Sequence, residues 1–326
     1  MRICVVGAGA IGGMLAARLA LAGNEVSLVA RGAHLQAIRD AGLVLIGDDG
    51  VQQVARPVCA TDVPAQAGRQ DLVILALKAH QVAGVAAQLR ALLEPDTRIV
   101  TMQNGIPWWY FHGLDGPWRG TTLHSLDPDG SLARHIPVER VVGSVVYPAC
   151  EVIRPGVVQV IEGNRFSLGE PDGSDSPSLR AIGAVFKGAG LRAPVTTDIR
   201  SEIWLKVWGN LSFNPISALT HATLEDICLH APTRALAATM MTEAQAIGEK
   251  LGARFKVSLD KRIAGAQAVG AHKTSMLQDV EQGRPLELQA LVGAVAELGR
   301  ITQTPTPAID AVWALASLLA RTLQHH

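Results

Sequence analysis

Three glycines near the start of the chain have the spacing of a loop that binds a dinucleotide. They are Gly7, Gly9 and Gly12, in the pattern G-x-G-x-x-G. The first glycine of this pattern permits a tight turn, the second lets bare backbone approach a pyrophosphate, and the third permits close packing of a helix on a strand. An apolar run at residues 3–6 precedes the motif, and an Ala/Leu-rich stretch at residues 14–22 follows it. The motif alone is weak evidence, but its position between a strand and a helix predicts dinucleotide binding.

The start of that helix is expected to supply the phosphate contacts, because free N–H groups at a helix N-terminus bind anions. The expected cofactor-binding run is Gly7, Ala8, Gly9, Ala10, Ile11 and Gly12. The second predicted strand, residues 25–29, indicates which dinucleotide is bound. Sites for NAD carry an acid near the end of this strand, whereas sites for NADP carry a cation for the 2′-phosphate. The chain has Arg31 here and no acid, which favours NADPH. The structural alternative is a solvated surface arginine.

The composition is typical of a globular protein with large apolar cores. The chain has 326 residues, 48% of them hydrophobic and 18% charged, and its formal net charge is zero. This length favours two domains. The lack of any Lys/Arg-rich run argues against nucleic acid or an anionic membrane as the main partner. No apolar stretch of the sequence is long enough to span a bilayer.

The four cysteines give no sign of a metal site or a disulfide framework. Cys4, Cys59, Cys150 and Cys228 are scattered, and no histidine stands at metal-ligand spacing from them. We therefore expect buried thiols and no bound metal. A strand predicted from residue 2 leaves no room for a signal peptide. Together these observations predict a cytoplasmic protein in a reducing compartment.

Strand and helix patterns alternate through the first half of the chain. Helices are predicted at residues 33–41 and 81–93, the second ended by Pro95, and strands at residues 71–77 and 98–102. Shorter strands are predicted within residues 43–60. Such alternation predicts a doubly wound parallel sheet. Residues 141–169 contain β-runs separated by turn residues, which is typical of an antiparallel extension.

Beyond about residue 198 the pattern is helical throughout. Apolar residues recur at three- and four-residue spacing in six segments, residues 200–219, 232–251, 258–271, 276–282, 287–301 and 306–323. We predict an α/β domain over residues 1–197 and an all-α domain over residues 198–326, with the nicotinamide end of the cofactor in the cleft between them. An apolar helical domain is compatible with a homodimer.

Further polar residues stand where ligands bind in folds of this kind. Lys78 follows the strand at residues 71–77 and Asn104 follows the next strand, and the carboxyl ends of parallel strands form the ligand-binding rim of a doubly wound sheet. Lys206, Asn210 and Asn214 recur at four-residue spacing in a segment rich in large apolar side chains, so they share one helix face. A structural alternative is two asparagines bonded to neighbouring backbone, beside a lysine whose stem lies along apolar surface.

Together these segments resemble the ketopantoate reductase (2-dehydropantoate 2-reductase) family from end to end. The resemblance is carried by the glycine motif, Leu77-Lys78-Ala79, Gln103-Asn104-Gly105, the segment from Lys206 to Asn214-Pro215, and Ser275-Met276-Leu277-Gln278-Asp279 followed by Glu287. It implies an N-terminal Rossmann-type α/β domain that holds NADPH and an all-α C-terminal domain. The activity it implies is NADPH-dependent reduction of a small 2-oxo acid, ketopantoate to pantoate, on the route to coenzyme A.

The resemblance also implies a role for each matching residue. Lys206 is the expected general acid, and Glu287 is expected to accept from the distal hydroxyl of the substrate and to help keep Lys206 charged. Ser275 and Asn104 are expected at the carboxylate end of the substrate. The remaining roles are Asn210 and Asn214 in the pocket wall, Lys78 near the nicotinamide ribose, where Asn104 also contacts the cofactor, and Arg31 at the 2′-phosphate.

A lysine suits this reaction for physical reasons. Hydride addition to a 2-oxo acid builds negative charge on the carbonyl oxygen, so a cation nearby stabilises the transition state more than the ground state. Lysine, unlike arginine, releases its proton near working pH when it is partly desolvated. A buried ammonium is costly by itself, and the carboxylate of Glu287 would offset that cost.

Simpler structural interpretations stay open for three residues of the last motif. Ser275 precedes an apolar helix and is as readily its N-cap as a substrate ligand. Glu287 is alternatively an exposed first-turn acid favoured by the helix dipole. We expect Asp279 to be a helix-surface residue.

Two features depart from the family pattern. Four adjacent aromatic residues, from Trp108 to Phe111, follow Asn104 in a chain with 4% aromatic residues. They are either a hydrophobic plug or dimer contact, or a segment that lines the substrate cleft. The asparagine that the family carries after the lysine helix has no counterpart around Thr223. Two alternatives therefore stay open: a reductase of a different 2-oxo or aromatic oxo acid, and a catalytically silent dinucleotide-binding regulator.

Overall fold

The computed structural model describes residues 1–324, and the chain divides into two compact units. The first, which we call the α/β unit, comprises residues 1–103, 109–122 and 129–199. The second, the helical unit, comprises residues 104–108, 123–128 and the chain from residue 200 onward. Two short segments of the N-terminal half therefore pack with the C-terminal helices. This packing is more interleaved than the single boundary predicted between residues 197 and 198.

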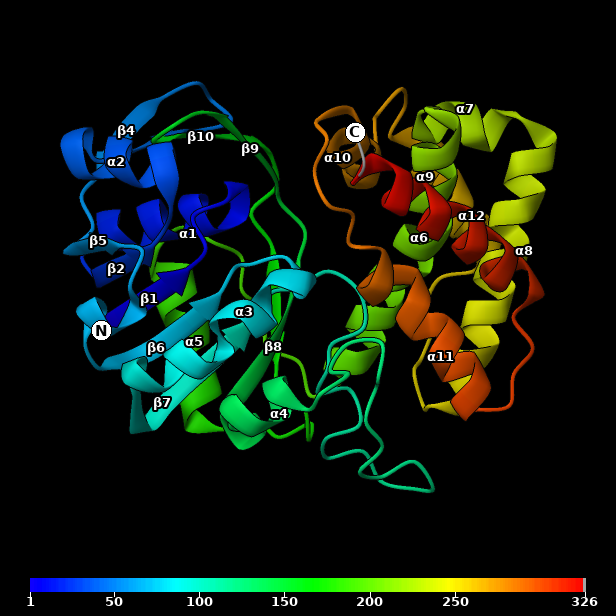
Figure 1. The fold of residues 1–326 in the computed structure, drawn as a ribbon, viewed down its shortest axis with the longest axis horizontal. Coiled ribbons are helices and arrows are strands. Elements are labelled where there is room, and N and C mark those ends of the chain that lie inside the picture. The colour runs from blue at the N-terminus through cyan, green and yellow to red at the C-terminus, as the bar shows by residue number, and fades with distance from the viewer. Residues whose placement is uncertain (325–326) are drawn as a thin grey trace. The chain divides into compact units, whose positions relative to one another are not determined.

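A seven-stranded sheet is the framework of the α/β unit (Figure 1). Its order is β11-β8-β7-β6-β1-β2-β5, and every neighbouring pair is parallel except β8 and β11. The strands are β1 (Arg2–Val6), β2 (Glu25–Val29), β5 (Cys59–Thr61), β6 (Gln70–Leu75), β7 (Leu93–Thr101), β8 (Val141–Val146) and β11 (Phe166–Gly169). The chain winds outward from β1 in both directions, so the carboxyl ends of β1 and β6 meet at the switch point where such sheets bind ligands. The predicted doubly wound sheet is confirmed.

A second, four-stranded sheet covers the first helix. Its order is β4-β3-β10-β9, with β3 (Leu43–Ile46), β4 (Gln52–Ala55), β9 (Ala149–Arg154) and β10 (Val157–Glu162). Helix α1 (Ala10–Leu21) contacts strands of both sheets. A helix enclosed in this way must be apolar on all sides, which explains its Ala/Leu-rich sequence. The fit is close: a Cβ on Gly13 would lie 2.7 Å from Cγ2 of Val158.

The remaining helices of the α/β unit are short, and one predicted boundary is wrong. They are α2 (Gly32–Ala41), α3 (Ala79–Leu89), α4 (Ser131–His135) and α5 (Pro177–Gly188), with the 3₁₀ turns η1 (Pro64–Ala67), η2 (Arg90–Leu92) and η3 (Val138–Arg140). Pro95, predicted to end a helix reaching residue 93, instead lies inside β7, where Leu93 already pairs with Gln70 of β6. Proline is tolerated near the beginning of a strand.

The segment predicted as an antiparallel extension divides between the two sheets. Strand β8 joins the large sheet in parallel to β7, and β11 returns antiparallel to it. Between them, β9 and β10 form an antiparallel pair, and β10 pairs in parallel with β3 in the small sheet. The prediction was therefore right for two of the strand pairs and wrong for the placement of β8.

The helical unit is built around one long helix. Its elements are α6 (Ile199–Thr220), α7 (Leu224–Leu229), α8 (Ala231–Lys250), α9 (Leu259–Ala268), α10 (Ser275–Glu281), the π-helical turn η4 (Gln289–Gly293), α11 (Ala294–Ile301) and α12 (Pro307–Leu323). Trp204 and Trp208 of α6 are fully buried against Phe255, and the indole N–H of Trp208 donates to the carbonyl of Met241 in α8 at 2.6 Å. The predicted all-α region is confirmed, while α7 was not predicted.

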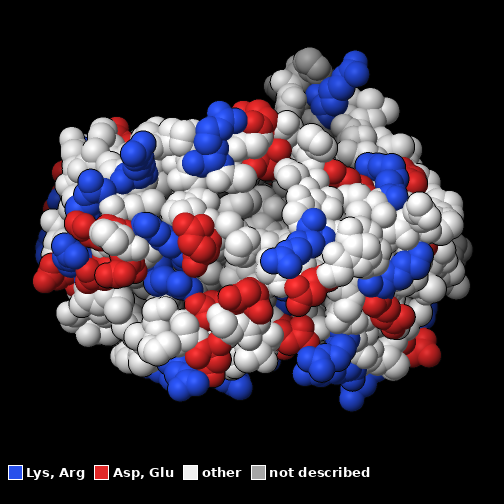
Figure 2. Space-filling model, turned by 90° about the horizontal axis from the view of Figure 1, so that it is seen from below, with Lys and Arg blue, Asp and Glu red and all other residues white. Residues whose placement is uncertain are grey.

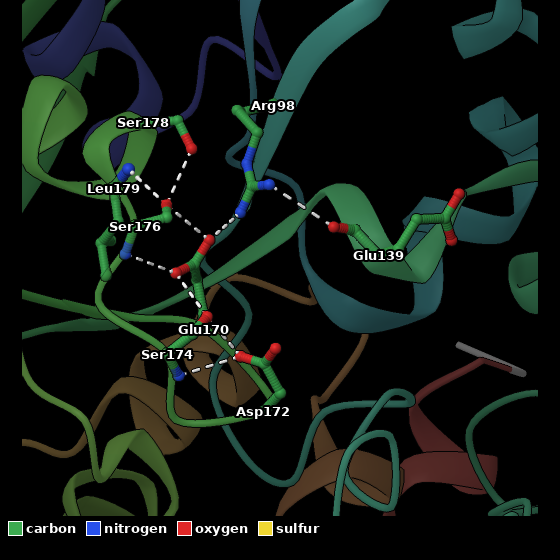
Figure 3. A network of polar contacts seen from close by, with 8 residues as sticks. All are labelled: Arg98, Glu139, Glu170, Asp172, Ser174, Ser176, Ser178 and Leu179. Atoms are coloured by element: carbon green, nitrogen blue, oxygen red, sulfur yellow. Dashed lines mark hydrogen bonds and ion pairs between the residues drawn. The ribbon is translucent and has the colours of Figure 1, made fainter.

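A buried ion pair fixes the end of β11 to the start of α5 (Figure 3). Glu170 accepts hydrogen bonds from the hydroxyls of Ser174 and Ser176 at 2.8 and 2.9 Å, and its carboxylate pairs with the guanidinium of Arg98 from β7. Ser176 is also the N-cap of α5 and accepts from the N–H of Leu179 at 3.1 Å. One carboxylate thus joins a central strand, a loop and a helix N-terminus.

The surface carries mixed charge. On the face drawn in Figure 2, basic and acidic side chains lie interspersed, and the formal net charge of the chain is zero. Within residues 1–324, no helix combines the length and apolarity needed to cross a membrane. The same residues contain no cluster of His, Cys, Asp and Glu placed to bind a metal ion.

The cysteines are less uniformly buried than expected. Cys4 and Cys228 are buried, whereas Cys59 and Cys150 are half-buried, and all four are free thiols. Burial raises the pKa of Cys4 and of Cys150 to about 12, so these two thiols stay protonated and unreactive at neutral pH.

We predict that Glu170→Ala lowers the free energy of unfolding by about 3–5 kcal/mol, because it leaves the guanidinium of Arg98 without its buried partner. Denaturant unfolding measures this directly. The matched control is Asp175→Ala in the same loop, which removes an exposed ion pair with Arg180 and should leave stability nearly unchanged. Equal effects of the two substitutions would show that the Glu170 network does not stabilise the fold.

Candidate active site

The glycine loop has the backbone geometry that its spacing predicts. Gly7 has a φ of +106°, and a Cβ there would lie 2.9 Å from the carbonyl oxygen of Ala76. A Cβ on Gly12 would lie 1.8 Å from the carbonyl oxygen of Gly7, whereas one on Gly9 would meet open space. Gly7 and Gly12 are therefore required by the turn and by helix packing. Gly9 leaves bare backbone exposed, as a phosphate-binding loop needs.

The N-terminus of α1 presents unpaired backbone donors beside this open space. Gly9 is the N-cap and the first turn contains no acidic residue. The first N–H of the helix to find an intrahelical partner is that of Gly13, which donates to Gly9 at 2.7 Å. The N–H groups of Ala10, Ile11 and Gly12 thus belong to the orphan donors of a helix start, and with the partial positive charge there they fit a pyrophosphate.

Two cations stand on the same rim of the sheet. Arg31 is exposed just after β2 and is the N-cap of α2, and Lys78 follows β6 as the N-cap of α3. The backbone N–H of Lys78 donates to Oε1 of Gln81 at 3.1 Å. Because β2 and β6 both pair in parallel with β1, their carboxyl ends lie at the same edge as the glycine loop. The α/β unit therefore fits a dinucleotide with cations on either side of its phosphates.

The helical unit brings Lys206, Asn104 and Glu287 together. The ammonium of Lys206 donates to Oδ1 of Asn104 at 2.6 Å, and Nδ2 of Asn104 donates to Oε2 of Glu287 at 3.4 Å. The asparagine thus bridges the lysine and the carboxylate. These residues lie 102 and 183 positions apart in sequence, so only the tertiary fold places them in contact.

The protonation of Lys206 is set by two opposing effects. Burial lowers the pKa of Lys206 from its ordinary 10.5 to about 8, and the negative charge of Glu287 raises it in part. A pKa near 8 leaves most of the amine protonated at neutral pH while making it a stronger acid than a solvated lysine. Such a group can donate a proton to a developing alkoxide.

The other predicted substrate contacts lie on α6 and α10. Asn210 is half-buried and Asn214 is 5% exposed, on the same face of α6 as Lys206. Ser275 is exposed at the first residue of α10. Its alternative role as N-cap is wrong, because Thr274 caps the helix by accepting from the N–H of Leu277 at 3.2 Å. The hydroxyl of Ser275 is therefore not needed for capping.

Asp279 was predicted to lie on the helix surface, and this is also wrong. Asp279 is 5% exposed, and its carboxylate pairs with the guanidinium of Arg284 at 2.9 Å. The backbone N–H of Arg284 also donates to the carbonyl of Asp279 at 2.8 Å. The pair closes the turn that leads from α10 toward Glu287, so Asp279 helps to determine the path of the chain before Glu287.

The aromatic segment is mostly part of the packed core. Trp109, Tyr110 and Phe111 are each at most 3% exposed, and the indole N–H of Trp109 donates to the hydroxyl of Thr101 at 2.9 Å. The ring of Trp109 lies so close to β8 that a Cβ on Gly143 would be 2.7 Å from it. For these three residues the structure favours the hydrophobic plug over a cleft lining.

Sequence reasoning missed how Asn104 is held. The next residue, Gly105, has a φ of +94° and lies directly against the backbone of Ala290 in η4. Gly105 was noted only as part of a motif, and its positive φ had no separate signal. The π-helical turn was predicted as ordinary helix, since a π-turn has no distinct hydrophobic period.

Comparison with known proteins agrees with the fold. Residues 3–115 match the family model "Ketopantoate reductase PanE/ApbA", and residues 198–320 match "Ketopantoate reductase PanE/ApbA C terminal". A 2-dehydropantoate 2-reductase from Mesorhizobium japonicum is 58% identical over 321 residues, which cover 98% of each chain. A solved structure of a candidate ketopantoate reductase from Ralstonia solanacearum MolK2 is 43% identical, with a TM-score of 0.94 and coverage of 99% and 98%.

A more distant likeness concerns the fold alone. The structure of D-mandelate dehydrogenase with NADH and anilino(oxo)acetate has a TM-score of 0.81 at 22% identity, with 99% of each chain covered. Together with the family matches, the two units define a reductase of the Rossmann-plus-helical class. More narrowly, the chain belongs to the ketopantoate reductase PanE/ApbA family. The predicted family, fold class and oxidoreductase activity on a carbonyl group are confirmed, and the family depends on a nicotinamide dinucleotide.

Proposed function

We propose that this protein reduces 2-dehydropantoate (ketopantoate) to pantoate with NADPH, and that Lys206 is the general acid. The observation that carries the proposal is the hydrogen bond from Lys206 to Asn104, which in turn donates to Glu287, in a chain 58% identical to a relative named 2-dehydropantoate 2-reductase. A buried ammonium held by an amide and backed by a carboxylate suits a reaction that builds negative charge on oxygen.

We assign the substrate to the helical unit. Its keto oxygen would accept a hydrogen bond from Lys206, and its distal hydroxyl would donate to Glu287. The carboxylate end would lie at Ser275 and Asn104, with the neutral amides of Asn210 and Asn214 in the pocket wall. Amides suit this place because they orient a polar substrate without changing its protonation.

The proton moves from Lys206 to the keto oxygen. When bound, the cofactor supplies a hydride from its reduced nicotinamide to the carbonyl carbon. Negative charge then grows on the oxygen, and the ammonium stabilises it and transfers a proton, a contribution of about 10²–10⁴-fold from a positioned acid. Glu287 keeps the amine protonated beforehand, since its charge raises the pKa of Lys206. The amine regains its proton from solvent once the product has left.

We assign the cofactor to residues 1–197. The run Gly7, Ala8, Gly9, Ala10, Ile11 and Gly12 would bind the pyrophosphate, Arg31 the 2′-phosphate, and Lys78 and Asn104 the nicotinamide ribose. Residues 198–326 would form the substrate domain, to which Asn104 is contributed from the earlier half of the chain. Arg31 favours NADPH because its planar guanidinium can donate two hydrogen bonds to one phosphate.

The biological setting follows from this chemistry. Reduction of ketopantoate supplies pantoate for pantothenate biosynthesis, a pathway of the cytoplasm. We retain a homodimer as a proposal for the assembly of the chain.

Substrate identity is tested by comparing 2-oxo acids with purified protein. We expect kcat/KM for ketopantoate to exceed that for pyruvate, 2-oxoisovalerate and phenylglyoxylate by at least tenfold, measured by loss of NADPH absorbance. Phenylglyoxylate represents the aromatic oxo acids. A higher value for any other acid would replace ketopantoate as substrate, and micromolar NADPH binding without turnover on any of them would indicate a silent regulator.

The role of Lys206 is tested by the pH dependence of kcat. With a pKa of about 8, the reduction rate should be constant at lower pH and fall as pH rises through 8, because only the protonated amine is an acid. Glu287→Gln removes the charge that raises this pKa, so the fall should begin at lower pH. Lys206→Ala should lower kcat about a hundredfold or more and leave NADPH binding nearly unchanged. Near-normal turnover of Lys206→Ala would exclude it as the acid.

The role of Arg31 is tested by nucleotide affinity. Arg31→Ala should weaken NADPH binding by roughly 10–100-fold relative to NADH, the loss of charge-assisted hydrogen bonds to one phosphate. Titration by nucleotide fluorescence gives both Kd values. Arg39→Ala is the matched control, since Arg39 is an exposed arginine of the same helix that donates to the carbonyl of Ala60. If NADPH and NADH lose affinity equally in Arg31→Ala, the residue does not recognise the 2′-phosphate.

A further inference from the structure

The backbone that carries Asn104 lies directly against the π-helical turn that follows Glu287. Gly105 has a φ of +94°, and a Cβ there would lie 2.2 Å from the carbonyl oxygen and 2.4 Å from the carbonyl carbon of Ala290. Both distances are far inside van der Waals contact, and the obstacle is backbone. No side chain fits at Gly105 unless one of the two backbones moves away.

A hydrogen bond completes the contact. The N–H of Ile106 donates to the carbonyl oxygen of Ala290 at 2.8 Å, and Ile106 is 1% exposed. In a regular α-helix that carbonyl would accept only from the residue four positions on. The π-helical turn Gln289–Gly293 changes this spacing and presents the carbonyl of Ala290 to the Gly105–Ile106 segment.

The same contact determines where two side chains of the site lie. Asn104 immediately precedes Gly105, and Glu287 precedes Ala290 by three residues. The two segments are fixed to each other where Gly105 meets Ala290. The side chain of the preceding residue, Asn104, donates to Glu287 at 3.4 Å and accepts from Lys206 at 2.6 Å. A displacement at Gly105 is therefore passed to both hydrogen bonds of Asn104.

We propose that Gly105, docked on the π-helical turn at Ala290, is a positioning residue that sets the Lys206–Asn104–Glu287 geometry for proton transfer. The proposal rests on the function proposed above, because it assigns Gly105 a role in that same site. Gly105 acts through Asn104 and touches no reacting atom. Its requirement is steric, since only a residue without a Cβ allows this approach.

The test is Gly105→Ala in the full-length protein. Misplacement of a catalytic group by about 1 Å costs on the order of a hundredfold in rate, so we expect kcat to fall at least tenfold. The Kd for NADPH should rise much less than kcat falls, because the loss is limited to the one cofactor contact proposed for Asn104, and the glycine loop is formed within the α/β unit. Without the acceptor Asn104, the buried ammonium loses support for its charged form, so the fall in kcat should begin at lower pH than in the parent.

Gly252→Ala is the matched control. Gly252 has a φ of +83°, similar to that of Gly105, but a Cβ there would meet nothing within 4 Å. It therefore introduces the same kind of backbone strain in the helical unit without the clash on Ala290. We expect kcat and its pH profile to be unchanged. Equal losses in Gly252→Ala and Gly105→Ala would assign the effect to strain alone and overturn the proposal.

A double substitution separates positioning from a merely structural role. If Gly105 acts through Asn104, then Gly105→Ala should have little further effect on kcat or on the pH profile in an Asn104→Ala background. Independent, multiplicative losses would contradict the proposal. Should Gly105→Ala not fold, Ala290→Gly adds no atoms and makes the backbone of the π-helical turn at this contact more flexible. It should shift the pH profile in the same direction by a smaller amount, and an unchanged profile would overturn the proposal.

Failure of this proposal is distinguishable from failure of the proposed function. If the parent protein reduces no 2-oxo acid of the panel, the proposed function is wrong. If the parent is active and Gly105→Ala retains its kcat and pH profile, only the positioning role is wrong.

Discussion

The helical unit must hold the positive charge of Lys206 where it is largely removed from water. Removing an ammonium from water costs several kcal/mol even after local relaxation, and a pKa of about 8 in place of 10.5 corresponds to roughly 3 kcal/mol against the charged form. The cost is not larger because Asn104 accepts a hydrogen bond from Lys206 and Glu287 adds a negative charge one residue beyond. The ammonium of Lys206 thus requires that three segments far apart in sequence lie together, those that carry Asn104, Lys206 and Glu287.

The α/β unit is constrained by backbone contact in a similar way. Gly12 lies against the carbonyl of Gly7, and Gly13 lies against Val158 of the small sheet, so helix α1 is held closely between two sheets. A helix fixed so firmly keeps its N-terminal N–H groups in one direction. In both units a glycine without a Cβ permits a close approach of two backbone segments. This approach orients backbone N–H donors in the glycine loop and, beside the π-helical turn, the amide of Asn104.

The parts of the fold that sequence reasoning predicted are those determined locally. Neighbouring residues in the sequence are enough to predict the glycine loop, the strand β2 and the long helix α6. The family motifs add Lys206 and Glu287 as expected site residues. The small sheet was not predicted because it depends on the pairing of β3 with β10, more than 100 residues apart. Thr274 and Ser275 are both residue types that favour the N-cap position, and only the folded backbone shows which of them occupies it. Asp279 has the pattern of a surface acid because its partner, Arg284, lies beyond the end of the helix.

The identity of the bridging residue suits the general-acid role proposed for Lys206. The negative charge of Glu287 favours the ammonium and raises the pKa of Lys206, whereas burial lowers it. An apolar neighbour would leave the charge unsupported, and the amine would become neutral. The neutral amide of Asn104 accepts a hydrogen bond from the ammonium and donates one to the carboxylate of Glu287, so it supports both charges without adding a charge of its own. Burial and the charge of Glu287 together give a pKa of about 8, close to neutral pH, where a positioned acid is most effective. In the proposed mechanism the Asn104 contact supports the ammonium of Lys206, which is why the docking of the Asn104 backbone on Ala290 would bear on the reaction.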